Sequence, residues 1–326
     1  MTTNSVMATP PVLRRESRSR TALAAAMLVW AGTAAGQQPA EMAAPYVPTP
    51  SAVATAMCEL AGVTKRDTVV DLGSGDGRIV IEAAKHFGAR GVGIDISPGL
   101  VHLANENALR AGVAPRVKFF VGDLFKTTLS QATVVFMYLL PASLAHLVPK
   151  LYEELAPGTR VVSHDYALDP LHPVKRLELD VPEKEKITGT PRTFLYLYVI
   201  AAPVAGQWSM VLPASLGGHA VFEFEQQLDH VTGYLEGDGS RAAFTDVAMN
   251  GRELRFVVQA LGSQKDVHFQ LAVRDSGVEG IVLVNGIELQ VSGFREGQPA
   301  RETGPAVRDL GGAPRSHSAP VWPIPK

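Results

Sequence analysis

The spacing of hydrophobic residues changes partway along this chain of 326 residues. Between about residues 49 and 200, short continuous apolar runs alternate with stretches in which apolar residues recur every three or four positions. Continuous runs are typical of strands that are buried on both faces, and the longer spacing predicts amphipathic helices. Strands that alternate with helices indicate an α/β protein built on a parallel sheet.

Local signals place the elements of this sheet. Thr49-Pro50 predicts the start of a helix, with threonine as the N-cap and proline at the first helical position, and Gly62 predicts its end. The last two strands are separated by a stretch with the composition of a charged, proline-containing loop. We expect helices over 50–61, 79–87, 98–111 and 144–155, and strands over 68–72, 91–95, 117–121, 133–138, 160–164, 174–179 and 194–200.

After residue 205 the pattern becomes one of short β-rich runs. Turn sequences such as Asn250-Gly251 and Asn285-Gly286 lie between them, and these residue pairs favour hairpins. The pattern predicts a small antiparallel all-β domain, formed as a sheet, a sandwich or a barrel. No motif for chemistry is found in it, which favours a structural or partner-binding role. The runs cover 208–212, 221–228, 231–235, 254–259, 267–273, 280–284 and 288–294.

The ends of the chain differ from both parts. Residues 1–41 carry four arginines between positions 14 and 20, then an apolar run over 21–36, which is typical of a secretory signal peptide. We expect an exported or periplasmic protein, with membrane association as the alternative if this segment stays as an anchor. If translation starts at Met27 or Met42, the protein is cytoplasmic. The predicted domains are therefore 42–205 and 206–297, followed by a proline-rich disordered tail over 298–326.

The segment from Val69 to Arg78 carries the most informative motif. A buried strand leads into Asp71-Leu72-Gly73-Ser74-Gly75-Asp76-Gly77, and a second strand ends in an acid, Asp95. This pattern indicates a pocket for a nucleoside cofactor. A dinucleotide fingerprint needs glycine where Arg78 stands, which argues against a dehydrogenase, and the Lys-Ser/Thr pair of a P-loop is missing.

These residues resemble motif I of the class I methyltransferases that use S-adenosylmethionine. The resemblance continues in order along the chain, because Asp95 and Ile96 match the acid that binds the ribose, and Asp123 and Leu124 match the site beside the adenine. It implies a Rossmann-like sheet of seven strands that ends in an antiparallel pair. The implied cofactor residues are Asp71, Gly73, Ser74, Gly75, Asp76, Gly77, Asp95, Ile96, Asp123 and Leu124. For Asp76, a loop-capping carboxylate is an equal alternative.

A narrower resemblance covers about residues 44–200. Three stretches are similar to the ATP-synthase c-subunit lysine methyltransferases and their bacterial relatives, namely residues 45–50, 71–85 and 123–125. Asp95-Ile96-Ser97-Pro98 differs from the version containing Glu in eukaryotic members. On the acceptor side, the resemblance places Tyr46, Thr49, Tyr138 and Pro141 at the mouth of the pocket. His164-Asp165 ends the fifth strand, as a base or as a structural histidine.

Composition limits the remaining choices. A net charge of -2 without a long basic run lacks the electrostatic footprint of a nucleic-acid binder. The single cysteine, Cys58, lies in an apolar pattern and is expected in the core. Scattered histidines predict no metal site. We expect a methyltransferase acting on a nucleophilic acceptor such as a protein lysine, with a small-molecule methyltransferase or a non-catalytic S-adenosylmethionine-binding module as alternatives.

Overall fold

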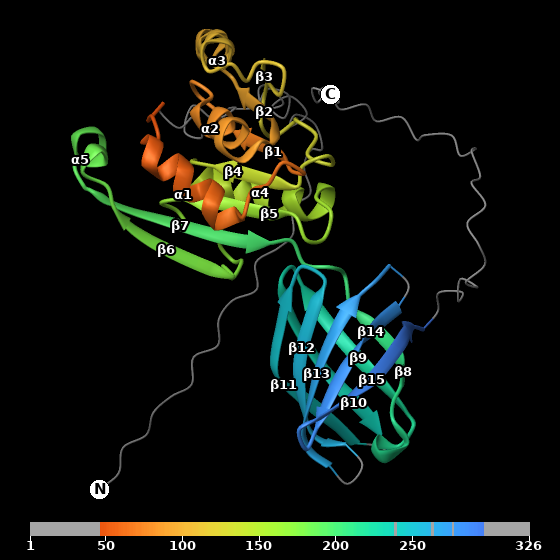
Figure 1. The fold of residues 1–326 in the computed structure, drawn as a ribbon. Helices are drawn as coiled ribbons and strands as arrows, with labels where there is room; N and C mark the ends of the chain where they lie inside the picture. Colours follow the sequence, from red (N-terminus) through yellow and green to blue (C-terminus); the bar gives the residue numbers. More distant parts are fainter. Residues whose placement is uncertain (1–45, 238–239, 262–263, 276, 297–326) are drawn as a thin grey trace, which may run out of the picture. The chain divides into compact units, whose positions relative to one another are not determined.

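The computed structural model describes residues 46–237, 240–261, 264–275 and 277–296. The predicted signal segment over 1–41 and the predicted tail over 298–326 lie outside these residues. Within the described ranges, no helix is long and apolar enough to cross a membrane. The elements form a seven-stranded sheet with helices, followed along the chain by a closed β-barrel (Figure 1).

The sheet has the strand order β3-β2-β1-β4-β5-β7-β6. Strands β1 to β5 are parallel where they pair, and β7 runs antiparallel to both of its neighbours. This confirms the predicted Rossmann-like sheet with its antiparallel final pair. The strands are β1 (Thr68–Leu72), β2 (Arg90–Asp95), β3 (Val117–Val121), β4 (Val134–Met137), β5 (Arg160–His164), β6 (Lys175–Asp180) and β7 (Arg192–Val199).

Helices cover both faces of this sheet because its strands are apolar on both sides. Val69 faces one hydrophobic cluster with the apolar residues of α1, α2 and α3, and Val70 faces another cluster with those of α4. Alternation along one strand thus fills two cores. The helices are α1 (Ser51–Ala61), α2 (Arg78–Phe87), α3 (Pro98–Arg110), α4 (Pro141–Glu154) and α5 (Pro182–Thr188).

Two local predictions are wrong. Helix α1 starts one residue later than expected, because Pro50 rather than Thr49 is its N-cap, with an extended ψ of 146°. The charged stretch between β6 and β7 contains the short helix α5, whose proline at the first turn and left-handed Gly189 at the end are ordinary helix boundaries. The high charge of this stretch concealed those two signals.

The second part of the chain is a closed antiparallel barrel. Neighbouring strands pair in chain order, and β15 pairs back onto β8, so no edge strand is left open. This decides between the sheet, the sandwich and the barrel that the sequence allowed. The strands are β8 (Gly206–Val211), β9 (His219–Gln227), β10 (His230–Gly237), β11 (Ser240–Asn250), β12 (Glu253–Leu261), β13 (Gln264–Val273), β14 (Gly277–Val284) and β15 (Ile287–Arg295).

One strand of the barrel was not predicted. Strand β11 is rich in alanine, and its pairing with β12 shifts register between Thr245 and Ala248, so its sequence lacks a clean alternation. The predicted hairpin at Asn285-Gly286 is confirmed, because both residues have positive φ angles of 51° and 80°.

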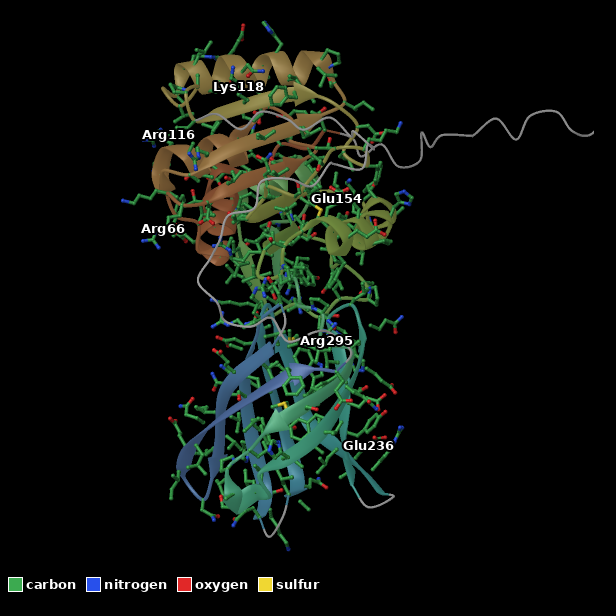
Figure 2. All side chains as sticks on the ribbon, turned by 90° about the vertical axis from the view of Figure 1, so that its right-hand side faces the viewer. Arg66, Arg116, Lys118, Glu154, Glu236 and Arg295 are labelled. Carbon is green, nitrogen blue, oxygen red and sulfur yellow. The ribbon has the colours of Figure 1, made fainter. Side chains whose placement is uncertain are left out.

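Aromatic side chains fill the barrel. Phe256 stacks on Phe269 at a centroid distance of 4.9 Å and on Phe244 at 4.5 Å. Trp208 and Phe222 are almost completely buried with them. Figure 2 draws the side chains of the barrel strands as sticks, with Glu236 and Arg295 labelled. An eight-stranded barrel has room for such a side-chain core.

The segment just before β8 belongs to the barrel core. Ala202 and Val204 are buried in its hydrophobic cluster. The indole N–H of Trp208 donates to the Val204 carbonyl at 2.8 Å, and the side chain of Gln226 accepts from the Val204 N–H at 2.7 Å. A boundary near residue 201 therefore separates the two hydrophobic cores better than the predicted boundary at 205.

We expect a fragment of residues 42–201 to fold cooperatively and to bind S-adenosylmethionine, because its sheet is complete at Val199 and domains carry their own cores. Thermal unfolding followed by circular dichroism, together with calorimetric titration of the cofactor, tests this. The full chain is the control. An aggregated fragment, or one that does not bind while the full chain does, would make the barrel integral to the methyltransferase part.

Candidate active site

The predicted site residues lie at one edge of the sheet. The strand order reverses between β1 and β4, and ligands of open α/β sheets bind at the carboxyl ends of the strands beside such a reversal. The glycine turn follows β1, Asp95 ends β2, Tyr138 follows β4, and His164 ends β5. Figure 1 labels these four strands. Topology thus brings residues that are distant in sequence to the same edge.

The turn after β1 requires glycine. Gly73, Gly75 and Gly77 have φ angles of 82°, 53° and 83°, which side chains rarely adopt. A Cβ on Gly75 would lie 2.5 Å from Cε2 of Tyr46. The backbone N–H groups of Gly73 and Ser74 both donate to the Ile94 carbonyl at 2.9 Å, which fixes the turn against β2.

Asp95 connects the two loops of the pocket. One carboxylate oxygen accepts from the Gly75 N–H at 2.8 Å, and the other accepts from the Ser97 N–H at 2.9 Å. A carboxylate oxygen can accept two hydrogen bonds, so both oxygens keep a position for a ligand hydroxyl. This arrangement fits the predicted ribose contact.

The turn after β3 lies next to this acid. The Gly122 N–H donates to the Asp95 carbonyl at 2.9 Å. Asp123 accepts from the Phe125 N–H at 2.9 Å and pairs with Lys126 at 3.3 Å, so part of its carboxylate orders its own turn. Leu124 is half-buried against the α4 cluster, and Ile96 is 75% exposed, so Ile96 has apolar surface free for a ligand.

Asp76 braces the glycine turn. Its carboxylate receives a two-pronged bond from Arg78, with Nε at 2.8 Å and Nη2 at 2.6 Å, and the remaining Arg78 Nη1 donates to the Thr49 carbonyl at 2.7 Å. Burial acts to raise the pKa of Asp76, but the bonds and charge of Arg78 and a bond from Tyr46 lower it below its usual value. Of the two roles considered for Asp76, the geometry favours the loop brace.

Two buried polar groups underlie the pocket. Asp71 is 2% exposed, and burial, with the negative charges of Asp95 and Asp76, raises its pKa to about 8. At neutral pH it holds a proton and can donate a hydrogen bond. The hydroxyl of Ser74 is buried and has no hydrogen-bond partner within the described ranges. Open acceptors on Asp95, an unpaired hydroxyl on Ser74 and a turn built on three glycines fit a nucleoside cofactor.

The acceptor-side residues divide into two groups. The Tyr46 ring packs over Gly75 and is 46% exposed, whereas Thr49 is 4% exposed and contributes its carbonyl to Arg78. Tyr138 is half-buried, and its hydroxyl donates to Asp165 at 3.0 Å. Pro141 is exposed at the first turn of α4. The structure therefore leaves Tyr46 and Tyr138, but not the Thr49 side chain, accessible to an acceptor.

His164 is fully buried against the Tyr138 ring, with a centroid distance of 3.9 Å. Burial and, to a smaller extent, the Lys184 charge lower its pKa to about 4, although Asp165 opposes the shift. Neither ring nitrogen has a hydrogen-bond partner in the described part of the chain. A buried neutral imidazole with so low a pKa is a poor general base, which favours the structural alternative.

Two contacts of the site had little or no signal in the sequence. Arg78 reaches Thr49 across 29 positions, and Lys184 reaches Asp165 across 19. Lys184 lies in the stretch that was expected to be a loop, yet it is only 3% exposed. Elsewhere Cys58 is fully buried, and burial raises the pKa of its thiol, which agrees with a core residue. Among the described residues, no group of His, Cys, Asp and Glu is arranged to hold a metal ion.

Comparison with known proteins identifies the family. The family model described as the ANTKMT methyltransferase domain matches residues 71–175. The protein-lysine N-methyltransferase of Saccharolobus islandicus (strain REY15A) is 41% identical over 157 residues, which cover 48% of this chain and 93% of that protein. The chain belongs to this family of S-adenosylmethionine-dependent methyltransferases.

Other relatives match shorter stretches. The mouse lysine N-methyltransferase of the ATP synthase c-subunit is 43% identical over 99 residues, which cover 30% of this chain and 40% of that protein. A crystal structure described as an RNA methyltransferase from Salinibacter ruber in complex with S-adenosyl-L-homocysteine is 47% identical, with 48% of this chain and 96% of that chain covered and a TM-score of 0.44. The barrel lies outside the residues that the family model matches.

We expect Asp95→Ala to weaken binding of S-adenosylmethionine by about 10- to 150-fold, because hydrogen bonds to a charged group contribute about 1.5–3 kcal/mol. The same carboxylate also holds the Gly75 N–H, so the loss combines ribose contacts with order in the turn. Calorimetric titration measures the dissociation constant. Asp180→Ala, at the exposed end of β6, is the matched control. Equal affinity in both variants would exclude Asp95 from the cofactor site.

The proton on Asp71 predicts a pH dependence of stability. Because the folded pKa of about 8 lies above the unfolded value near 4, the folded state binds more protons between these values, and stability falls as pH rises through this window. Asp71→Asn removes this loss. From pH 5 to 8 we expect the free energy of unfolding of the wild type to fall by up to about 1.4 kcal/mol per pH unit relative to that of the variant.

Urea unfolding at pH 5–9 measures the difference between wild type and Asp71→Asn. Asp76→Asn is the control with a constant difference from wild type, because the lowered pKa of Asp76 gives stability that is lost only in acid, below this pH range. A constant difference between wild type and Asp71→Asn across this range would show that Asp71 carries no proton in the folded protein.

Proposed function

We propose that the protein is a protein-lysine N-methyltransferase that transfers a methyl group from S-adenosylmethionine to the Nζ atom of a lysine on a protein acceptor. The observation that carries this proposal is the 41% identity with the archaeal protein-lysine N-methyltransferase, because the match covers 93% of that protein. The mouse relative, a lysine N-methyltransferase of the ATP synthase c-subunit, gives the same acceptor class over a shorter match.

The geometry of the pocket mouth supports an amine acceptor. Tyr46 is exposed and Tyr138 is half-buried, so both have aromatic surface open to an acceptor, whereas the imidazole of His164 is buried out of reach. An amine attacks only when it is neutral, and partial burial favours the neutral form by lowering the lysine pKa. The attacking nitrogen can then release its extra proton to water after transfer, so the site needs no dedicated general base.

The remaining residues hold the two reactants in line. When bound, S-adenosylmethionine supplies a methyl group on a positively charged sulfur, and the electron pair of the broken carbon–sulfur bond stays on that sulfur. Asp95 and the glycine turn would hold the nucleoside, and Ser74 and Asp71 would offer hydrogen-bonding groups to the bound cofactor. Positioning of this kind supplies much of the rate enhancement in transfers between bound groups.

A labelling experiment tests the acceptor class. The full-length protein is incubated with S-adenosylmethionine carrying a tritiated methyl group and a lysate of the source cell. The products are then divided into protein, RNA and dialysable fractions. We expect label in protein, sensitive to protease, and recovered as methylated lysine after acid hydrolysis. Acetylation of the lysate lysines before the reaction should abolish it, and Asp95→Ala should reduce it by at least 10-fold at limiting cofactor.

Label in the other fractions would contradict the proposed protein acceptor. Label in the dialysable fraction would support the small-molecule methyltransferase, and label in RNA would contradict the protein acceptor as well. Absence of transfer to all three fractions, with normal cofactor binding, would support a non-catalytic module. The exported location stays a prediction, which sequencing of the N-terminus of the protein isolated from its cells would test.

A further inference from the structure

Asp165 is held in one position by the strands around it. It is the first residue after β5 and has a left-handed backbone with a φ of 62°. Its N–H donates to the Phe194 carbonyl at 2.7 Å, and its Oδ1 accepts from the Phe194 N–H at 3.2 Å. Both neighbouring groups come from β7, so the carboxylate cannot turn without breaking bonds to that strand.

A buried lysine completes this support. The Nζ atom of Lys184, on α5, donates to Asp165 Oδ1 at 2.7 Å and to the Arg192 carbonyl at 2.6 Å. The lysine is 3% exposed. A buried ammonium group is stable only with a paired charge and full hydrogen bonding, so Lys184 and Asp165 depend on one another as an ion pair.

The ion pair determines which way the Tyr138 hydroxyl points. An ionised carboxylate can only accept, so in the 3.0 Å bond between Tyr138 and Asp165 Oδ2 the proton must come from the tyrosine. Burial and the charge of Asp165 raise the pKa of Tyr138 above its usual value, so the hydroxyl keeps this proton. The His164 ring, packed at 3.9 Å, limits movement of the phenol ring.

We propose that the Asp165–Lys184 pair positions Tyr138 as an obligatory hydrogen-bond acceptor for the N–H of the incoming amine. With its own proton committed to Asp165, the Tyr138 oxygen presents only lone pairs toward the pocket mouth. An amine nitrogen that gives one N–H to this oxygen keeps its own lone pair free to attack. This inference rests on the proposed amine acceptor, and it makes Asp165 and Lys184 positioning residues that do not touch the substrate.

The variant Asp165→Asn tests the direction of this bond. Asparagine tolerates the left-handed backbone and keeps an oxygen for Phe194 and Lys184, but it turns an NH₂ group toward Tyr138. The tyrosine must then accept, and its proton faces the acceptor amine. We expect kcat/KM for the lysate protein fraction labelled by wild type to fall about 10-fold, with the dissociation constant of S-adenosylmethionine unchanged within twofold.

Tyr138→Phe and the double variant separate positioning from general damage. If Asp165 acts through the tyrosine hydroxyl, Asp165→Asn should cause no further loss of kcat/KM in the Tyr138→Phe background. The proposal would be overturned if the loss of kcat/KM in the double variant equalled the product of the losses in the two single variants. It would also be overturned if Asp165→Asn had wild-type kinetics. Tyr198→Phe is the matched control, since this buried β7 tyrosine accepts from the Leu168 N–H at 2.9 Å and, within the described residues, makes no hydrogen bond to Asp165 or Lys184. It should lower the melting temperature without changing the kinetics.

A spectroscopic measurement needs no methyl acceptor. In protein labelled with ¹³C at the tyrosine Cζ atoms, the Tyr138 signal is assigned by its absence in Tyr138→Phe. We expect this signal to move in Asp165→Asn because the bond direction reverses, and to stay in place in Tyr198→Phe. An unmoved signal would overturn the role of Asp165. Because this result does not depend on transfer, it distinguishes failure of this inference from failure of the proposed lysine acceptor.

Discussion

Two backbone N–H groups, from Gly75 and Ser97, converge on the carboxylate of Asp95. The two groups belong to different loops, one after β1 and one before α3, so a single side chain ties the two loops together. The turn contains three glycines with positive φ angles, and glycine can adopt many backbone conformations. Contacts from outside the turn are therefore needed to hold it in one conformation. Asp95 gives that support from one side, and the Asp76–Arg78–Thr49 contacts give it from the other.

Carboxylates at this sheet edge have different roles because their surroundings differ. Asp71 is buried beside two other carboxylates, and this raises its pKa to about 8, so it holds a proton at neutral pH. Asp76 is partly buried as well, but the Arg78 guanidinium lies against it and keeps it ionised. Asp165 lies on a buried ammonium. Similar side chains thus serve as a neutral donor, a loop brace and a fixed acceptor.

The barrel has the character of a separately packed body. Its core is a stack of aromatic rings, its strands close without an open edge, and the family model does not extend over it. Its sequence carries no motif for chemistry. The family match and the candidate site both lie in the sheet part of the chain, and the structural or partner-binding role of the barrel stays a prediction.

The sequence by itself determined the elements whose signals are local. Continuous apolar runs predicted the strands of the sheet, the spacing from Asp71 to Gly77 predicted the turn, and acids at strand ends predicted Asp95 and Asp123 beside it. Only the tertiary structure decided that Thr49 binds Arg78 through its carbonyl, that β11 closes a barrel, and that Lys184 is buried under Asp165. The physical reason is that periodicity and turn propensity act between near neighbours, whereas burial and ion pairing depend on which distant strands the topology brings together.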